Sequence, residues 1–182
     1  MLAGESFAPD DSGLLADRTR AAELLERFNA IPEREAERAM PILCELLGSL
    51  GEGCHVIPPF RCDFGYNVHV DDGAFINFDV AIMDGSPVHI GKRALIGPRS
   101  LISTAVHPID IAERATGRVS SEPVTICDDV WLGAGVIVAP GVTIGEGSVI
   151  GAGSVVTHDI PSGVVAVGSP CRVIRQIGQD EG

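Results

Sequence analysis

Five histidines are the side chains of this sequence best suited to moving a proton near neutral pH, because an unperturbed imidazole has a pKa of about 6.5. His69 and His89 each precede an aliphatic residue of a regular pattern, and His55 and His158 flank glycine or loop segments. Surface positions are expected for these four. His107 differs, because it lies in the segment STAVHPID at the start of a long irregular stretch, and such loops tend to carry function.

Cysteine chemistry is not indicated. The five cysteines contain no CxxC pair and leave one odd thiol, so reduced and mostly packed thiols are expected in place of a disulfide framework. They are Cys44, Cys54, Cys62, Cys127 and Cys171.

Composition excludes several classes of partner. The 182 residues carry a formal net charge of −12, which argues against nucleic acid or an anionic membrane, since both bind basic surfaces. The first residues include acids and no apolar run long enough for a signal peptide or a membrane span, so a cytoplasmic location is expected. The 22 glycines and 12 prolines, with only 4% aromatic residues, indicate many short strands and tight corners.

Two helices are predicted before these strands. Leucine and alanine recur at three-to-four-residue spacing from Ser12 onward, with charged residues between them, and Pro32 ends the first helix. A second helix is predicted over residues 33–50, where Gly48 and Gly51 mark its end.

A six-residue repeat follows the helices and predicts the fold. Every sixth residue is aliphatic, apart from one two-residue slip and one 24-residue gap that keeps the phase. The twelve positions are Val70, Ile76, Ile82, Ile90, Ile96, Ile102, Ile126, Leu132, Val138, Ile144, Ile150 and Val156. A period of six suits a parallel β-helix in which each hexad is one short strand with a corner and three hexads complete a turn.

The predicted organisation is therefore mainly β. It consists of an N-terminal helical segment over residues 1–52, a parallel β-helix over residues 53–177 and a short tail over residues 178–182. Residues 103–123 form a loop that leaves the coil and returns in phase, and His107 lies on it.

Three motifs connect these elements to a known family. The segments PPFRCDFGYN at residues 58–67, STAVHPID at residues 103–110 and GSPCRVIRQI at residues 168–177 resemble the maltose and galactoside O-acetyltransferases. The resemblance covers nearly the whole chain, and the helices and Asp63 fit the maltose type better than the galactoside type. It implies a left-handed β-helix, a homotrimer, and transfer of acetyl from acetyl-CoA to a sugar hydroxyl.

The resemblance also implies catalytic roles for two residues. His107 corresponds to the family's general base, and Asn77 to the asparagine that stabilises the oxyanion of the transition state. The alternatives are structural: His107 could fold the loop back through a backbone hydrogen bond, and Asn77 could cap backbone groups at a corner.

The acceptor sugar would lie against acidic residues. Asp63 corresponds to an acceptor-binding position of the family, and a carboxylate suits a polyol because it accepts hydrogen bonds from hydroxyl groups. Where the galactoside enzymes have a second acid, this chain has Gly85, with Asp84 beside it. An N-terminal acid of the family matches Asp10 or Asp11 only with a gap.

Coenzyme A would lie along a strip of small residues. Ala134 and Ala152 correspond to contact positions of the family, with Gly151 beside them, although small residues are also what corners require. Thr157 and His158 correspond to a further contact pair, in which His158 replaces the usual lysine.

The nucleotide end of coenzyme A carries phosphates, which suit arginine. Arg172 and Arg175 correspond to the family's phosphate-binding arginines, in a chain with few basic residues. The alternative for this pair is a solvated terminal charge cluster. Trp131 is expected at the coil edge, near the cofactor or in an interface.

Three rival functions follow from the same fold. A zinc lyase of the γ-carbonic anhydrase type would need three histidines around one metal, and no second histidine lies near His107 in the sequence, so no metal is expected. A non-catalytic scaffold subunit would not need the His107 loop. Acetyl transfer to an antibiotic, a serine or a lipo-oligosaccharide remains an alternative to transfer to a sugar.

Overall fold

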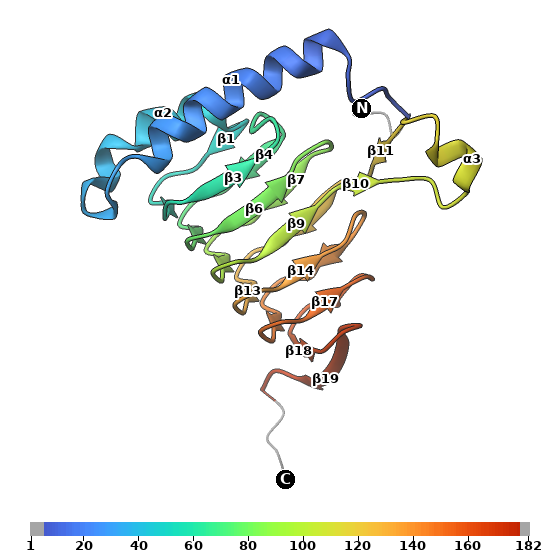
Figure 1. Cartoon of the computed structure of the whole chain (residues 1–182). Coiled ribbons are helices and arrows are strands. Elements are labelled where there is room, and N and C mark those ends of the chain that lie inside the picture. The colour runs from blue at the N-terminus through green and yellow to red at the C-terminus, as the bar shows by residue number, and fades with distance from the viewer. Residues whose placement is uncertain (1–5, 179–182) are drawn as a thin grey trace.

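The structure is a computed structural model that describes residues 6–178. Its strands stack in successive turns of a coil beneath the N-terminal helices (Figure 1). Three sheets of parallel strands form the three faces of the coil, and the chain visits face 1, face 2 and face 3 in rotation. The bends between faces are named here corner 1–2, corner 2–3 and corner 3–1. The predicted parallel β-helix is confirmed.

The strands are short, as corners every six residues require. Face 1 contains β1 (Ser49–Leu50), β4 (Val68–Val70), β7 (Val88–Ile90), β12 (Val124–Ile126) and β15 (Thr143–Ile144). Face 2 contains β2 (His55–Val56), β5 (Phe75–Ile76), β8 (Leu95–Ile96), β13 (Trp131–Leu132), β16 (Val149–Ile150), β18 (Val164–Val167) and β19 (Arg172–Gln176). Face 3 contains β3 (Phe60–Cys62), β6 (Val80–Met83), β9 (Leu101–Ser103), β14 (Ile137–Val138) and β17 (Val155–Val156).

The aliphatic ladder is the core of the coil. All twelve predicted positions are at most 1% exposed. Paired strands place them directly above one another, for example Ile90 above Val70 and Ile126 above Ile90 on face 1. Burial of a Val, Leu or Ile side chain contributes about 1.5–3 kcal/mol, so this ladder is the main source of the coil's stability.

The helices cover the N-terminal end of the coil (Figure 1). Helix α1 (Ser12–Asn29) begins at Asp11, whose carboxylate accepts hydrogen bonds from the backbone of the first turn. Its buried side chains, among them Leu24 and Phe28, belong to the hydrophobic core, and the helix contacts α2 (Met40–Leu46) and β3.

The prediction of one helix over residues 33–50 is wrong. That segment contains a 3₁₀ helix, η1 (Glu33–Arg38), then α2, then β1. Pro41 is tolerated at the start of α2 but cannot continue a preceding helix, because it lacks a backbone N–H. Leu50 pairs with Val70 as the first rung of the ladder, so the coil begins at Ser49 and not at residue 53.

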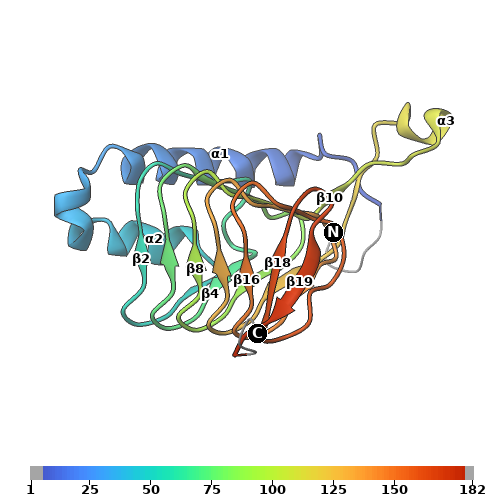
Figure 2. The same cartoon turned by 90° about the horizontal axis from the view of Figure 1, so that it is seen from below.

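All departures from the six-residue spacing between ladder positions lie at corner 3–1. Corners 1–2 and 2–3 keep six residues between ladder positions, from Val70 to Ile76 and from Ile76 to Ile82, for example. At corner 3–1 the steps are eight residues from Ile82 to Ile90 and 24 residues from Ile102 to Ile126. The long step is the predicted loop: a projecting arm, defined as residues 104–123, with β10 (Ala105–Val106), α3 (Ile111–Arg114) and β11 (Ser120–Ser121) (Figure 2).

The C-terminal strand closes one face of the coil. Strand β19 turns back and pairs antiparallel with β18, as the red strands of Figure 2 show. Most of the predicted tail, residues 179–182, lies outside the described residues. Between residues 6 and 178, no helix has the length and apolar character needed to cross a membrane.

Candidate active site

His107 lies on the arm, directly after β10. Its side chain is exposed, and its ring makes no hydrogen bond within residues 6–178. The predicted structural alternative, in which this ring ties the loop to its own backbone, is therefore not seen in the described part of the chain. The imidazole is free to meet a ligand.

Hydroxyl groups hold the base of the arm against corner 3–1. The Thr104 Oγ1 donates to the Met83 carbonyl at 2.7 Å and accepts from the Ser86 backbone N–H at 3.1 Å. The Ser86 and Ser121 hydroxyls lie 2.9 Å apart and are buried. Because both strands of the arm are anchored, the position of His107 is set by the coil. Sequence reasoning missed these residues, since isolated serines and threonines carry no spacing signal.

The N-terminal segment holds the arm from the other side. Phe7 and Val119 exchange two backbone hydrogen bonds of 2.8 and 3.0 Å. The Arg118 guanidinium of the arm also donates to Ser6. The tip of the arm exposes two large apolar side chains: Ile109 is 94% exposed and Ile111 75%. Exposed apolar side chains of this size are typical of surfaces that another protein covers.

Asp63 lies where β3 turns through corner 3–1. Burial raises the pKa of its carboxyl group, and the nearby Arg18 guanidinium opposes that rise. Arg18 itself lies 5.0 Å from the centre of the Phe64 ring. Asp63 and Arg18 both line a groove of about 770 Å³ between α1 and face 3, a size typical of ligand sites.

The predicted contacts of Asp84 and Gly85 with the acceptor are corrected by their burial. Asp84 is 0% exposed, and its Oδ1 accepts hydrogen bonds of 2.9 Å from the backbone N–H groups of Asp63 and Phe64. Gly85 is buried beneath Ser121 of the arm. Asp84 therefore holds the turn that carries Asp63, and it offers no surface to a sugar.

The two N-terminal acids have different surroundings. Asp11 caps α1, so its Oδ1 is already bonded to the helix. Asp10 is exposed, between the bridge formed by Phe7 and the start of α1.

Asn77, Ala134 and Ala152 lie together along corner 2–3. Asn77 and Gly133 occupy the same position of this corner in different turns of the coil. Ala134 and Ala152 occupy the next position of the corner, in two neighbouring turns. Both alanines are exposed. The Asn77 Oδ1 accepts from the Phe78 backbone N–H at 2.8 Å, which leaves the amide nitrogen as the donor end. This corner is thus narrow and flat, with a hydrogen-bond donor at one end.

Close packing of successive turns also requires small residues at this corner. A Cβ atom on Gly133 would lie 2.6 Å from the Ala152 backbone nitrogen. The requirement for a small residue at a tightly packed corner therefore explains Gly133. This requirement does not explain Ala134 and Ala152, because their side chains are exposed.

The remaining candidates occupy face 2 and corner 3–1. Trp131 stands 52% exposed on face 2 between Leu95 and Val149 of the neighbouring turns. Arg172 and Arg175 are exposed on β19 at the end of the same face.

Thr157 and His158 follow β17 at corner 3–1. Both are exposed, and the Thr157 Oγ1 lies 2.9 Å from the His158 Nδ1.

One chain does not bring the predicted site residues together. His107, Asp63 and Thr157 lie at corner 3–1, whereas Asn77 and Ala134 lie at corner 2–3. Face 3 separates these corners, and the six residues of one hexad extend up to roughly 20 Å at about 3.3 Å per residue. Within one chain, His107 and Asn77 therefore lie on different corners.

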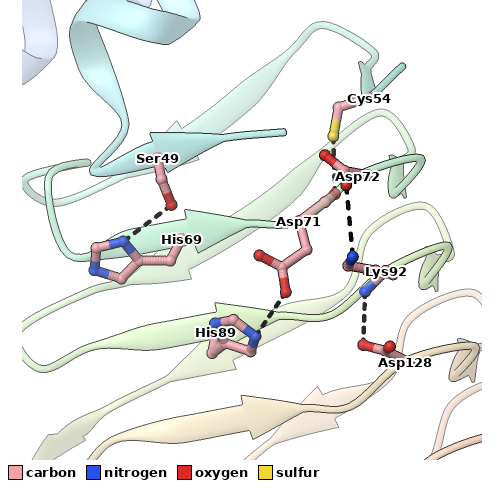
Figure 3. A network of polar contacts seen from close by, with 8 residues as sticks. All are labelled: Ser49, Cys54, His69, Asp71, Asp72, His89, Lys92 and Asp128. Carbon is pink, nitrogen blue, oxygen red and sulfur yellow. Dashed lines mark hydrogen bonds and ion pairs between the residues drawn. The ribbon is translucent and has the colours of Figure 1, made fainter. Parts of the chain in front are cut away.

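Two of the other histidines, His69 and His89, belong to a polar surface on face 1 (Figure 3). His69 and His89 occupy paired positions on β4 and β7. The His89 Nε2 lies 3.0 Å from Asp71 Oδ2, and the His69 Nδ1 lies 3.2 Å from Ser49 Oγ. Their partners are surface groups, in agreement with the predicted surface positions. Across residues 6–178, no three His, Cys, Asp or Glu side chains are grouped as metal ligands.

All five cysteines are free thiols. Burial and the neighbouring carboxylates of Asp84 and Asp63 raise the pKa of Cys62, which lines the groove. A thiol with a raised pKa is a poor nucleophile at neutral pH. Cys62 therefore fits a packed side chain and not a reactive one, as the spacing of the cysteines predicts.

Comparison with known proteins gives consistent matches along the chain. Residues 1–51 match the model of the maltose acetyltransferase hexapeptide capping motif, and residues 123–158 match the bacterial transferase hexapeptide model. A galactoside O-acetyltransferase of Lactococcus lactis is 42% identical over 178 residues, which cover 97% of this chain and 86% of that protein.

Two solved structures have the same architecture over nearly the whole chain. A maltose O-acetyltransferase from Clostridium difficile 630 is 44% identical with a TM-score of 0.95, covering 98% of this chain and 95% of that one. A galactoside acetyltransferase in complex with coenzyme A is 41% identical with a TM-score of 0.93, covering 97% and 88%.

Proposed function

This chain belongs to the maltose and galactoside O-acetyltransferases, hexapeptide-repeat enzymes that use acetyl-CoA, and on that premise we propose that it acetylates a sugar hydroxyl in a site shared between two copies of itself. His107 acts as the general base and takes the proton of the acceptor hydroxyl. The hydroxyl oxygen bonds to the thioester carbonyl carbon, the C–S bond breaks, and the thiolate of coenzyme A takes up a proton.

The other site residues bind the acceptor or stabilise the oxyanion of the transition state. The amide nitrogen of Asn77 donates a hydrogen bond to the oxyanion that forms on the thioester carbonyl, and donors of this kind are worth about 10²–10³ in kcat. Asp63 accepts hydrogen bonds from the acceptor. We assign no role in binding to Asp84 or Gly85, because both are buried.

Coenzyme A extends along corner 2–3 in this proposal. Ala134 and Ala152 let the pantetheine arm lie against the backbone, and Thr157 and His158 of a neighbouring copy face it across the cleft. Trp131 packs beside the cleft on face 2, and Arg172 and Arg175 bind the phosphates, for which a guanidinium group is suited.

The division of the site between two corners is the observation that supports a homotrimer. A threefold ring of coils brings corner 3–1 of one copy beside corner 2–3 of the next, which completes three identical sites. The arm fits this arrangement, because its exposed Ile109 and Ile111 need an apolar surface to cover them. We place the trimer in the cytoplasm, since five free cysteines suit a reducing compartment.

Mixed trimers test the shared site directly. His107→Ala and Asn77→Ala chains, each inactive alone, are co-expressed with different affinity tags, and trimers that carry both tags are purified. If each site takes His107 from one copy and Asn77 from the next, every mixed trimer contains one intact site of three. The expected activity, measured as thiol release from acetyl-CoA with a sugar, is about a third of wild type.

The control pairs His107→Ala with a chain that carries both substitutions, and these trimers should stay inactive. Doubly tagged trimers with no activity above the parents would place both residues of a site in one chain and contradict the proposal. A stable, fully active monomer in sedimentation would contradict it as well.

A further inference from the structure

The arm is held at a second place, away from its base, by residues 6–11, named here the N-terminal tie. Phe7 and Val119 exchange backbone hydrogen bonds of 2.8 and 3.0 Å. The Arg118 Nε donates to the Ser6 Oγ at 2.9 Å, and the Arg118 Nη2 donates to the Ser6 carbonyl. Four hydrogen bonds therefore join the tie to the arm, where the chain that leads into α1 runs beside β11 (Figure 1).

The other end of the tie is fixed to α1. Asp11 caps the first turn of this helix, and the Arg18 guanidinium donates to the Pro9 carbonyl at 3.0 Å. The tie therefore connects α1 to the arm. It gives the arm an anchor that is independent of the hydroxyl groups at corner 3–1.

The tie meets the arm at the row of residues that contains His107. Strand β10 pairs antiparallel with β11, and Val106 is opposite Ser120. Continuing this register by one residue places His107 opposite Val119. In an antiparallel pair the backbone groups of successive residues point to alternate edges, and those of Val119 point to Phe7. The row therefore crosses three chain segments, with His107 at one edge, Val119 in the middle and Phe7 at the other edge.

Strands β10 and β11 alone would support a catalytic group poorly. Each has only two residues, and an isolated two-stranded hairpin is marginally stable at best in water. His107 lies just beyond their last pair, at the kind of position where strands fray. Burial along the arm agrees with a support from the tie: across residues 105–120, Val119 in the middle of the row is the only buried residue.

We infer that the N-terminal tie and Arg118 are positioning elements for the general base, which hold the row that carries His107 where it meets the acceptor hydroxyl. Phe7 and Arg118 touch no reacting atom and act through His107. The inference rests on the proposed role of His107, and it adds to that role residues from the opposite end of the sequence.

Two substitutions break the contact between tie and arm in different ways. Arg118→Ala removes both side-chain bonds to Ser6 from an exposed position. Phe7→Pro removes the N–H that donates to the Val119 carbonyl, because proline has no backbone N–H. Arg93→Ala is the matched control, since it removes another exposed arginine with two side-chain hydrogen bonds, at corner 1–2 and away from the site. Thermal unfolding of all three variants checks that the coil is retained.

Arg118→Ala and Phe7→Pro should each lower kcat with a sugar acceptor at least about fivefold, because a misplacement of roughly 1 Å can cost about 10²-fold. Their KM for acetyl-CoA should stay within about twofold of wild type, since coenzyme A extends along corner 2–3 in the proposed site. Arg93→Ala should change neither constant. A kcat within about twofold of wild type in either tie variant would overturn the inference, and so would an equal loss in Arg93→Ala.

The same substitutions in the His107→Ala protein separate positioning of the base from any other role. If Arg118 acts through His107, Arg118→Ala should lower the residual rate of His107→Ala by less than about twofold, because residues that act as a unit are not additive. An equal fold-loss in both backgrounds would overturn the inference and leave the proposed function standing. If His107→Ala alone keeps the kcat of wild type, the proposed general base fails, and the inference fails with it.

Discussion

The imidazole of His107 is exposed and unbonded within the described residues, on an arm that is hydrogen-bonded at its base. His107→Ala should therefore leave the fold unchanged and lower kcat by about 10²–10⁴, the usual contribution of a positioned general base. Thiol release from acetyl-CoA at one fixed pH, with the same acceptor for both proteins, measures the loss.

His89→Ala is the matched control for this prediction. His89 pairs with Asp71 on face 1, away from both corners that carry the site. Its removal should leave kcat unchanged. A purified His107→Ala protein that acetylates within threefold of wild type would remove His107 from the mechanism.

Asp84 is a second residue whose environment makes a testable prediction. Burial is the largest cause of its raised pKa, and its Oδ2 has no hydrogen-bond partner among the described residues. Asp84→Ala removes the acceptor for two backbone N–H groups, and a lost acceptor of a buried donor costs about 1–3 kcal/mol. Its free energy of unfolding, measured in urea, should fall by about 2–4 kcal/mol.

Asp84→Asn separates charge from hydrogen bonding. The folded protein binds the Asp84 proton more tightly than the unfolded chain does, so this group's contribution to stability is present at low pH and is lost as the pH rises through the raised pKa. The asparagine variant keeps an acceptor oxygen and does not titrate. Relative to wild type, its free energy of unfolding should rise with pH from about 4 upward. A difference independent of pH would contradict the raised pKa.

The strands of the coil could be predicted because their stability comes from one repeated contact. Each ladder position is a buried aliphatic side chain above another, so the period of six is visible in the sequence without knowledge of the rest. Even the rungs that were missed carry this signal, since Leu50, Val56 and Cys62 are also six residues apart. The preceding residues have the apolar spacing of a helix, and the helix predicted over residues 33–50 included Leu50, so the start of the ladder was not recognised.

Segments without a repeat could not be predicted in the same way. The division of residues 33–50 into a 3₁₀ helix, α2 and β1 depends on tertiary contacts, such as Gly48 packed against the Tyr66 backbone. The hydroxyl groups that anchor the arm are likewise invisible until the fold brings Thr104 and Ser121 to one corner.

Contact between successive turns makes a prediction for Gly133. Its backbone does not require glycine, but a Cβ atom would lie 2.6 Å from the Ala152 nitrogen, which belongs to the next turn and cannot move independently. Gly133→Ala should lower the free energy of unfolding by about 1–3 kcal/mol, as overpacking of a close contact does. Ala134→Ser, on the exposed side of the same corner, should change it by less than about 0.5 kcal/mol. Equal effects in chemical denaturation would contradict the close contact.

At the scale of the whole molecule, the sequence proposed site residues without placing them in space. Family resemblance assigned His107 and Asn77 to one reaction, and the repeat assigned them to different parts of one coil. Only the structure shows that these parts are separate corners, because the arm has no period from which its direction could be deduced. Asp84 shows the opposite limit: its residue type suited a sugar, but burial gave it a structural role.

The concentration of irregular spacing at corner 3–1 has a consequence for how such proteins diversify. Corners 1–2 and 2–3 keep six residues between ladder positions in every described turn of the coil. At corner 3–1 the ladder tolerates steps of 6, 8 and 24 residues, since the chain simply leaves and rejoins the coil. Lengthening a flexible loop is cheap, about 0.6 kcal/mol for each doubling. Insertions and deletions at this one edge can therefore change the surface of the molecule while the scaffold stays the same.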